Sequence, residues 1–152
     1  MSYSRILCAI DVRQPSDEVV RQARTLAQGF QARVEVVYVR RSQEDAARLF
    51  GKKGVRASSQ QLMVNLINDK FEGVDAHGNL VDGDAGREIV RLAHDRKCDC
   101  IVMGSRGHVG LGKVFNPSVS DFVVRHSSLP VMTIAPARDP VELRIPDPMP
   151  NL

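Results

Sequence analysis

The sequence predicts a single α/β domain built on a parallel sheet of five strands, with helices on both faces. Two features carry this prediction. Short apolar runs without polar alternation recur along the chain, as is typical of strands that are buried on both faces. Amphipathic stretches long enough for crossover helices separate most of these runs. Because such crossovers are right-handed, a doubly wound, Rossmann-like sheet is the simplest topology.

The segment before residue 31 predicts a strand followed by a helix. The apolar run of residues 6–10 is the expected strand, and it ends at Asp11. Ser16 has the side chain of a helix N-cap, and Gly29 lies near the expected end of the helix. The apolar positions of this helix recur at three- and four-residue spacing, at Val19, Val20, Ala23, Leu26, Ala27 and Phe30.

The middle of the chain is less regular. A valine-rich run over residues 33–39 predicts the second strand. Residues 44–71 predict a short helix, a basic turn at residues 51–54 and a longer helix, because glycines interrupt the helical pattern. The third strand, over residues 74–81, is expected to be weak because Gly78 breaks it.

The later segments return to a clear alternation of helices and strands. Asp84 precedes a helical pattern with Ile89, Val90 and Ala93 on one face, and it is the expected N-cap. Residues 100–103 and 130–135 predict the last two buried strands. Between them we expect a glycine-rich loop over residues 104–112 and a helix that begins near Pro117.

A proline-rich tail over residues 137–152 follows the domain, which we place at residues 1–136. Within the tail, Val141, Leu143 and Ile145 alternate with polar residues between two prolines. This pattern fits a short edge strand, which we expect to lie on a partner subunit, and it equally fits a frayed terminus.

The composition excludes several classes of protein. The 152 residues, 43% hydrophobic and 26% charged, are those of one folded domain and not of a disordered or fibrous chain. The formal net charge is only +3 and the basic residues form no stripe, so nucleic acid binding is not expected. No apolar run approaches the roughly 20 residues that span a bilayer, so we expect a cytoplasmic protein without a membrane partner.

The three cysteines also indicate a reduced, intracellular setting. Cys8, Cys98 and Cys100 are odd in number, and their spacing suits neither a disulfide framework nor a zinc site. If Cys98 and Cys100 both lie on a strand, their side chains share one face without the geometry of a bridge. We expect ordinary packing for them and no redox chemistry.

The residues that carry chemistry follow the predicted strands. In parallel sheets, ligands bind beyond the carboxyl ends of the strands, where Asp11, Val39 and the loop over residues 104–112 are expected. The glycines of the loop allow backbone N–H groups to approach a phosphate, and the next helix presents its positive dipole end. We therefore expect one anion-binding site that uses all three segments.

Three common motifs do not fit this loop. The spacing Gly107-x4-Gly112-Lys113 is similar to a P-loop, but Val114 stands where a hydroxyl must reach Mg²⁺. A dinucleotide fingerprint would need a small residue where Phe115 stands. The nucleophile elbow G-x-S-x-G is absent from the sequence.

A fourth pattern fits, and it gives the sequence a family resemblance. The arrangement Gly104-x2-Gly107-x9-Pro117-Ser118 resembles the nucleotide motif of universal stress proteins, G-x2-G-x9-G-[S/T]. The resemblance extends over nearly the whole chain as far as Pro136. It includes Ile6 to Asp11, Val36 to Val39, Gly83-Asp84, and Val124-Arg125-His126 ahead of Pro130-Val131.

The resemblance implies a dimeric stress or regulatory protein that binds ATP or another adenine nucleotide, with or without Mg²⁺, and that pairs through residues 130–135. It assigns no catalytic residue and no metal ligand. The residues it assigns to the nucleotide are Ala9, Asp11 and Val39 around adenine and ribose, Met103, Gly104, Arg106 and Gly107 along ribose and phosphates, and Ser118, Val119 and Ser120 at the outer phosphates. Simpler roles also fit: Asp11 can cap a turn, Ser118 and Ser120 can belong to a first helical turn, and Arg106 can be solvated.

Pro117 departs from the family motif, because proline replaces the last glycine and has no N–H to offer a phosphate. Structurally the change is benign, since proline suits the first position of a helix and Asn116 is a good N-cap. The missing hydrogen bond costs about 10- to 150-fold in affinity, which Arg106 and Lys113 can partly offset. The alternative function is therefore a nucleotide-free dimer that acts through protein contacts. A slow ATPase is the weakest hypothesis, because no general base is placed near the expected phosphates.

Overall fold

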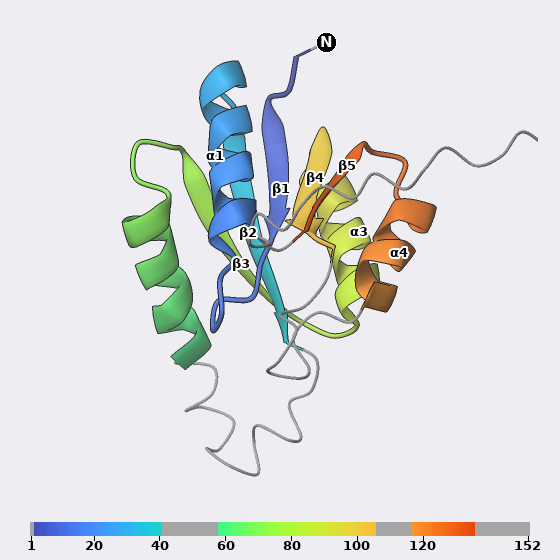
Figure 1. Cartoon of the computed structure of the whole chain (residues 1–152). Coiled ribbons are helices and arrows are strands. Elements are labelled where there is room, and N and C mark those ends of the chain that lie inside the picture. The colour runs from blue at the N-terminus through green and yellow to red at the C-terminus, as the bar shows by residue number, and fades with distance from the viewer. Residues whose placement is uncertain (1, 41–57, 106–116, 136–152) are drawn as a thin grey trace, which may run out of the picture.

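The strands form one five-stranded sheet in the order β3-β2-β1-β4-β5, and every neighbouring pair is parallel (Figure 1). The structure is a computed structural model, and it describes residues 2–40, 58–105 and 117–135. The strands are β1 (Arg5–Ala9), β2 (Arg33–Arg40), β3 (Ala76–Asp82), β4 (Cys100–Gly104) and β5 (Val131–Ile134). The predicted five-stranded, doubly wound parallel sheet is confirmed.

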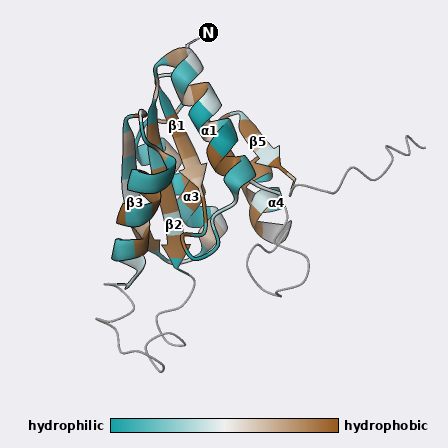
Figure 2. Cartoon of the chain, turned by 60° about the vertical axis from the view of Figure 1, so that its left-hand side comes forward, coloured by the Kyte–Doolittle hydropathy of each residue, from teal (hydrophilic) through white to brown (hydrophobic). Residues whose placement is uncertain are grey.

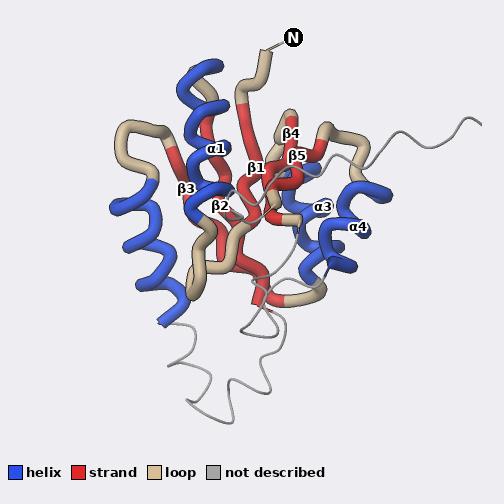
Figure 3. The backbone as a smooth tube through the Cα atoms, viewed as in Figure 1, coloured by secondary structure: helices blue, strands red, loops and turns tan. Residues whose placement is uncertain are grey.

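Helices cover both faces of this sheet. They are α1 (Asp17–Phe30), a helix over residues 58–70, α3 (Ala85–Asp95) and α4 (Pro117–His126). In Figure 1 and Figure 3, α1 and the helix over residues 58–70 lie on one face, and α3 and α4 lie on the other. None of the helices in the described ranges is long and apolar enough to cross a membrane.

Two separate hydrophobic cores result, because alternate residues of the central strands point to opposite faces. Ile6 and Cys8 of β1 belong to the first core, under α1, whereas Leu7 and Ala9 belong to the second core, under α3 and α4. Figure 2 shows β1 as a largely hydrophobic strand, while α1 carries hydrophilic positions. The second core also contains Val37, Ile89, Leu92, Ala93, Ile101, Met103, Val119 and Val123.

The helix starts follow local sequence signals. Ser16 is the N-cap of α1, and its hydroxyl accepts a hydrogen bond from the Val19 N–H. Asp84 is the N-cap of α3, and its Oδ1 accepts from the Arg87 N–H at 3.0 Å. Both predicted caps are therefore confirmed. The α1 helix runs on to Phe30, and the left-handed residue at its end is Gln31, with φ of 54°.

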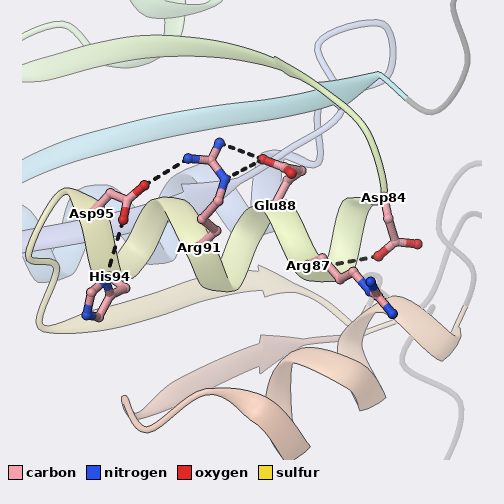
Figure 4. Close-up of polar contacts among 6 residues, drawn as sticks. All are labelled: Asp84, Arg87, Glu88, Arg91, His94 and Asp95. Atoms are coloured by element: carbon pink, nitrogen blue, oxygen red, sulfur yellow. Dashed lines mark hydrogen bonds and ion pairs between the residues drawn. The ribbon is translucent and has the colours of Figure 1, made fainter.

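The outer surface of α3 is stabilised by ion pairs within the helix (Figure 4). Arg91 donates to Glu88 Oε2 at 2.6 Å and to Asp95 Oδ2 at 2.8 Å. These three- and four-residue spacings place the side chains on neighbouring turns. The pairs are partly exposed, so we assign them a modest role in helix stability and none in ligand binding.

Gly78 does not break the third strand, contrary to the expectation from the sequence, and its surroundings show why glycine stands there. The third strand is continuous from Ala76 to Asp82 and is not broken at this glycine. A Cβ at position 78 would lie 2.6 Å from Met63 Cγ, which belongs to the helix over residues 58–70. The glycine therefore lets that helix pack closely on β3.

The cysteines differ from expectation in one respect. Cys98 lies before β4 in the second core, whereas Cys100 begins β4 and lies in the first core. The prediction that the two share a face required both to lie on the strand, and this condition is not met because β4 begins at Cys100. All three cysteines are free and buried. The expected short helix and basic turn at residues 44–57 and the tail at residues 137–152 lie outside the described residues.

Candidate functional site

The carboxyl ends of β1 and β4 define the switch point of the sheet. From β1 the chain continues to β2 and β3 on one side, and it then returns to β4 and β5 on the other side. Loops that leave neighbouring strands in opposite directions at such a point create a crevice for ligands. Asp11 follows β1, Gly104 ends β4, and α4 is the next described element after β4. The structure thus places these predicted site segments at one edge.

Asp11 holds the turn that leaves β1. Its Oδ1 accepts a hydrogen bond from the Arg13 N–H at 2.8 Å, and the residue is partly exposed. Within the described residues, Oδ2 has no hydrogen-bond partner. The turn-capping role expected from the sequence is therefore real, and it leaves one carboxylate oxygen for a ligand.

The end of β2 extends past its pairing with β1. The β1–β2 register ends at Ala9 opposite Val37, and the Ile10 N–H donates to the Val37 carbonyl at 3.0 Å. Odd-numbered residues of β2 direct their N–H and C=O groups toward β1, whereas the Gly83 N–H bonds to the carbonyl of Arg40 on the β3 side. The peptide groups of Val39 therefore face the space beyond β1. Among the described residues they have no partner across that edge.

The residues beneath the carboxyl ends of β1 and β4 are apolar. Ala9 and Met103 are 2% and 0% exposed, and both belong to the second core. Val119 in the first turn of α4 is buried in the same core. These three predicted site residues therefore lie beneath the strand ends, where their side chains fix the positions of β1, β4 and α4.

The end of β4 is held on both sides. The Ser105 N–H donates to the Ile134 carbonyl at 3.0 Å, and the Ser120 hydroxyl donates to the Ser105 carbonyl at 3.2 Å. Ser120 is buried, and its hydroxyl ties α4 to the start of the loop. A Cβ on Gly104 would come no closer than 3.8 Å to Val19 Cγ2 and 3.9 Å to the Ile134 carbonyl oxygen, which are ordinary contacts. Available space alone therefore does not require glycine there.

The remaining predicted residues are described only in part. Ser118 lies in the first turn of α4, and Pro117 is the first residue of that helix, as the sequence predicts. Arg106 and Gly107 lie outside the described residues.

Sequence reasoning missed four polar side chains at this edge. The Arg13 guanidinium lies 5.7 Å from the centre of the Tyr38 ring, and burial is the main cause that raises the pKa of Tyr38. Arg40 forms an ion pair with Asp82 across the ends of β2 and β3. The charged residues that end β2 and β3 are visible in the sequence, but only the strand register shows that Arg40 and Asp82 form a pair.

The fold and this edge define a Rossmann-like α/β protein whose candidate site lies at the switch point of its sheet. A model of the universal stress protein family matches residues 2–135. The chain belongs to the universal stress protein family.

Individual relatives agree with this assignment. A universal stress protein of Methanocaldococcus jannaschii is 28% identical over 145 residues, which cover 87% of this chain and 82% of that protein. The solved structure of a family member from Arabidopsis thaliana with AMP bound has a TM-score of 0.63 at 22% identity, over 88% of this chain and 92% of its own. The universal stress protein from Archaeoglobus fulgidus in complex with dAMP has a TM-score of 0.58 at 21% identity, over 88% and 98%. At these identities the two structures support the fold.

Proposed function

We propose that this chain is a cytoplasmic stress-response protein that binds an adenine nucleotide, ATP or AMP, and works as a regulatory dimer. The observation that supports the proposal is that the Val39 peptide groups have no partner on the β1 side among the described residues, at the edge of the sheet where Asp11 follows β1. Two relatives of the same fold have AMP and dAMP bound in their structures, which supports this class of ligand. The proposal requires no chemical step.

The base is recognised at the end of β2. The Watson–Crick edge of adenine carries an amino donor beside a ring nitrogen acceptor. The carbonyl of Val39 accepts from the amino group, and its N–H donates to the ring nitrogen. Guanine presents the opposite pattern at these two positions, so the same peptide selects adenine. Asp11 Oδ2 accepts a hydrogen bond from a ribose hydroxyl.

The phosphates extend from Gly104 toward the first turn of α4. There the free N–H groups and the dipole of the helix favour an anion. Pro117 removes one donor from this turn, so binding is weaker than with the glycine of the family motif. Arg106 and Lys113 supply compensating positive charge, and Ser118 and Ser120 contact the outer phosphates.

Calorimetric titration with AMP, ATP and GMP tests the proposal, together with extraction of any nucleotide that copurifies. Asp11→Asn is the informative variant, because it keeps an acceptor for the Arg13 N–H and removes the charge. We expect adenine nucleotides to bind in preference to GMP, and Asp11→Asn to bind about tenfold more weakly. The control is Asp95→Asn on the exposed face of α3, which leaves affinity unchanged. Absence of both binding heat and copurified nucleotide would refute the proposal.

The second candidate function is a nucleotide-free dimer, and Pro117 at the start of α4 is the observation that favours it. The variant Pro117→Gly restores the donor of the family motif. If this variant binds ATP tightly and the native protein does not bind at all, the second function is correct.

The dimer is proposed to form through β5. Within the described residues this strand lies at the edge of the sheet and pairs only with β4, and Met132 on it is 40% exposed. An apolar, unpaired sheet edge favours pairing with a second copy. In this proposal residues 1–136 form the domain, and Val141, Leu143 and Ile145 of the tail add a strand to the partner. Light scattering that gives the mass of a monomer would contradict this arrangement.

A further inference from the structure

Among the described residues, the last residues of β2 pair with β3 and not with β1. The pairing of β2 with β1 ends at Val37, whereas its pairing with β3 continues through Val39 opposite Val81 to Arg40 opposite Asp82. We call residues 38–40 the β2 overhang. A strand end that is paired on one side only has half of the ladder bonds that fix a central strand. Its position therefore depends strongly on whatever holds it to β3.

An ion pair stands at the tip of this overhang. Arg40 Nη2 donates to Asp82 Oδ2 at 2.9 Å, and Arg40 Nε lies 2.6 Å from Asp82 Oδ1. The first contact is a hydrogen bond, and the second is a close charge contact between two buried atoms without the geometry of a hydrogen bond. Together they hold the two side chains against each other across the strand ends. The Gly83 N–H adds a main-chain bond to the Arg40 carbonyl at 3.1 Å.

The arginine of this pair is largely shielded from water, and the aspartate is partly exposed. The side chain of Arg40 is 8% exposed and that of Asp82 is 28% exposed. A guanidinium buried to this extent is costly without an anion, so loss of the carboxylate displaces the arginine and with it the strand end. A contrasting pair stands at the other end of this ladder, where Arg33 of β2 contacts Asp75, the residue before β3, and these side chains are 42% and 57% exposed.

We propose that Arg40 and Asp82 are positioning residues for adenine recognition, which they support by clamping the β2 overhang to β3. This inference rests on the proposed function, because it assigns base recognition to the Val39 peptide between Val37 and Arg40. The clamp sets the direction of that peptide toward the space beyond β1. Neither charged side chain touches the nucleotide.

The experiment compares Asp82→Asn with Asp75→Asn, which removes the exposed pair from the other end of the β2–β3 ladder. Titration with ATP measures nucleotide binding, and competition by inorganic triphosphate measures phosphate binding without the base. We expect Asp82→Asn to weaken ATP binding about tenfold and to leave triphosphate competition unchanged. Asp82→Glu, which restores the carboxylate, recovers most of the affinity, and Asp75→Asn behaves like the native protein.

A second measurement tests the clamp without any ligand. Hydrogen exchange followed by NMR reports on the Arg40 and Gly83 amides, which join β2 to β3. Both amides exchange faster in Asp82→Asn than in Asp75→Asn. If Asp82→Asn does not fold, Arg40→Lys replaces it, because lysine keeps the charge but has one nitrogen and cannot make both contacts. The same faster exchange and weaker ATP binding are expected.

The outcomes separate the clamp from the proposed function. Unchanged exchange at Arg40 and Gly83 overturns the clamp, whatever the nucleotide results. Faster exchange with native ATP affinity overturns the link between the clamp and base recognition. Equal loss of ATP and triphosphate binding overturns a role specific to the base. Absence of ATP binding by the native protein refutes both the proposed function and the positioning role, and exchange then decides the clamp alone.

Discussion

Replacement of Asp99 by alanine gives a stability change whose size and pH dependence follow from the structure. One oxygen, Asp99 Oδ2, accepts three hydrogen bonds: from the Ser4 N–H at 2.7 Å, the Ser4 hydroxyl at 2.9 Å and the Arg5 N–H at 2.8 Å. These bonds join the residue before β4 to the start of β1. They also hold the pKa of Asp99 below its ordinary value of 3.8, with the Arg5 N–H as the largest cause.

The magnitude follows from these contacts. Hydrogen bonds to a charged acceptor contribute about 1.5 to 3 kcal/mol when buried, but this site is partly exposed and water competes for the donors. We therefore expect Asp99→Ala to lower the free energy of unfolding by about 1 to 2 kcal/mol at neutral pH. Because the pKa is lowered by folding, this stability is present above the ordinary pKa and is lost as the pH falls through the folded value.

Urea denaturation of Asp99→Ala and the native protein, across about pH 7 to pH 3, measures both quantities. The difference in unfolding free energy is expected to be largest at neutral pH and to shrink as the pH falls below 3.8. Asp95→Ala, which removes an exposed carboxylate from α3, is the control and changes stability little. Equal stability of Asp99→Ala and the native protein at neutral pH, or a difference that does not shrink in acid, would refute the reasoning.

Two further predictions concern the cores. Burial raises the pKa of Cys8 and Cys98 to about 12 and that of Cys100 to about 11. We therefore expect these thiols to react with a disulfide reagent at mildly alkaline pH only after the protein unfolds. Rapid labelling of the native protein would contradict this expectation. Phe71, which is 2% exposed, anchors the end of the helix over residues 58–70 in the first core, and Phe71→Ala lowers the free energy of unfolding by about 3 to 5 kcal/mol. Urea denaturation checks the second prediction, and a loss within experimental error of zero would show that Phe71 is not a core residue.

Features set by local chemistry were predictable from the sequence. Ser16 and Asp84 are N-caps because a short polar side chain stands just before an amphipathic stretch, and this arrangement is visible in the sequence. The doubly wound parallel sheet followed from the alternation of strands and helices. The placement of Asp11 and Gly104 at strand ends needed only the approximate ends of two apolar runs.

Features set by contacts between distant segments were not predictable. Gly78 was expected to break a strand, since the sequence does not show that Met63 packs against it. Arg40 and Asp82 are far apart in the chain, and only the strand register pairs them. The same holds for the overhang of β2, because its length depends on where β1 leaves the sheet.

The groups proposed to bind the base at the tip of β2 belong to the main chain, and this has a consequence for how the sequence can vary. Any amino acid except proline carries the same N–H and C=O at position 39. Exchange of the valine for another hydrophobic residue therefore preserves the donor and the acceptor, whereas a proline removes the donor and a change of backbone direction misplaces both. Comparison of side chains alone would overlook this position, although a ligand bound there would depend on it.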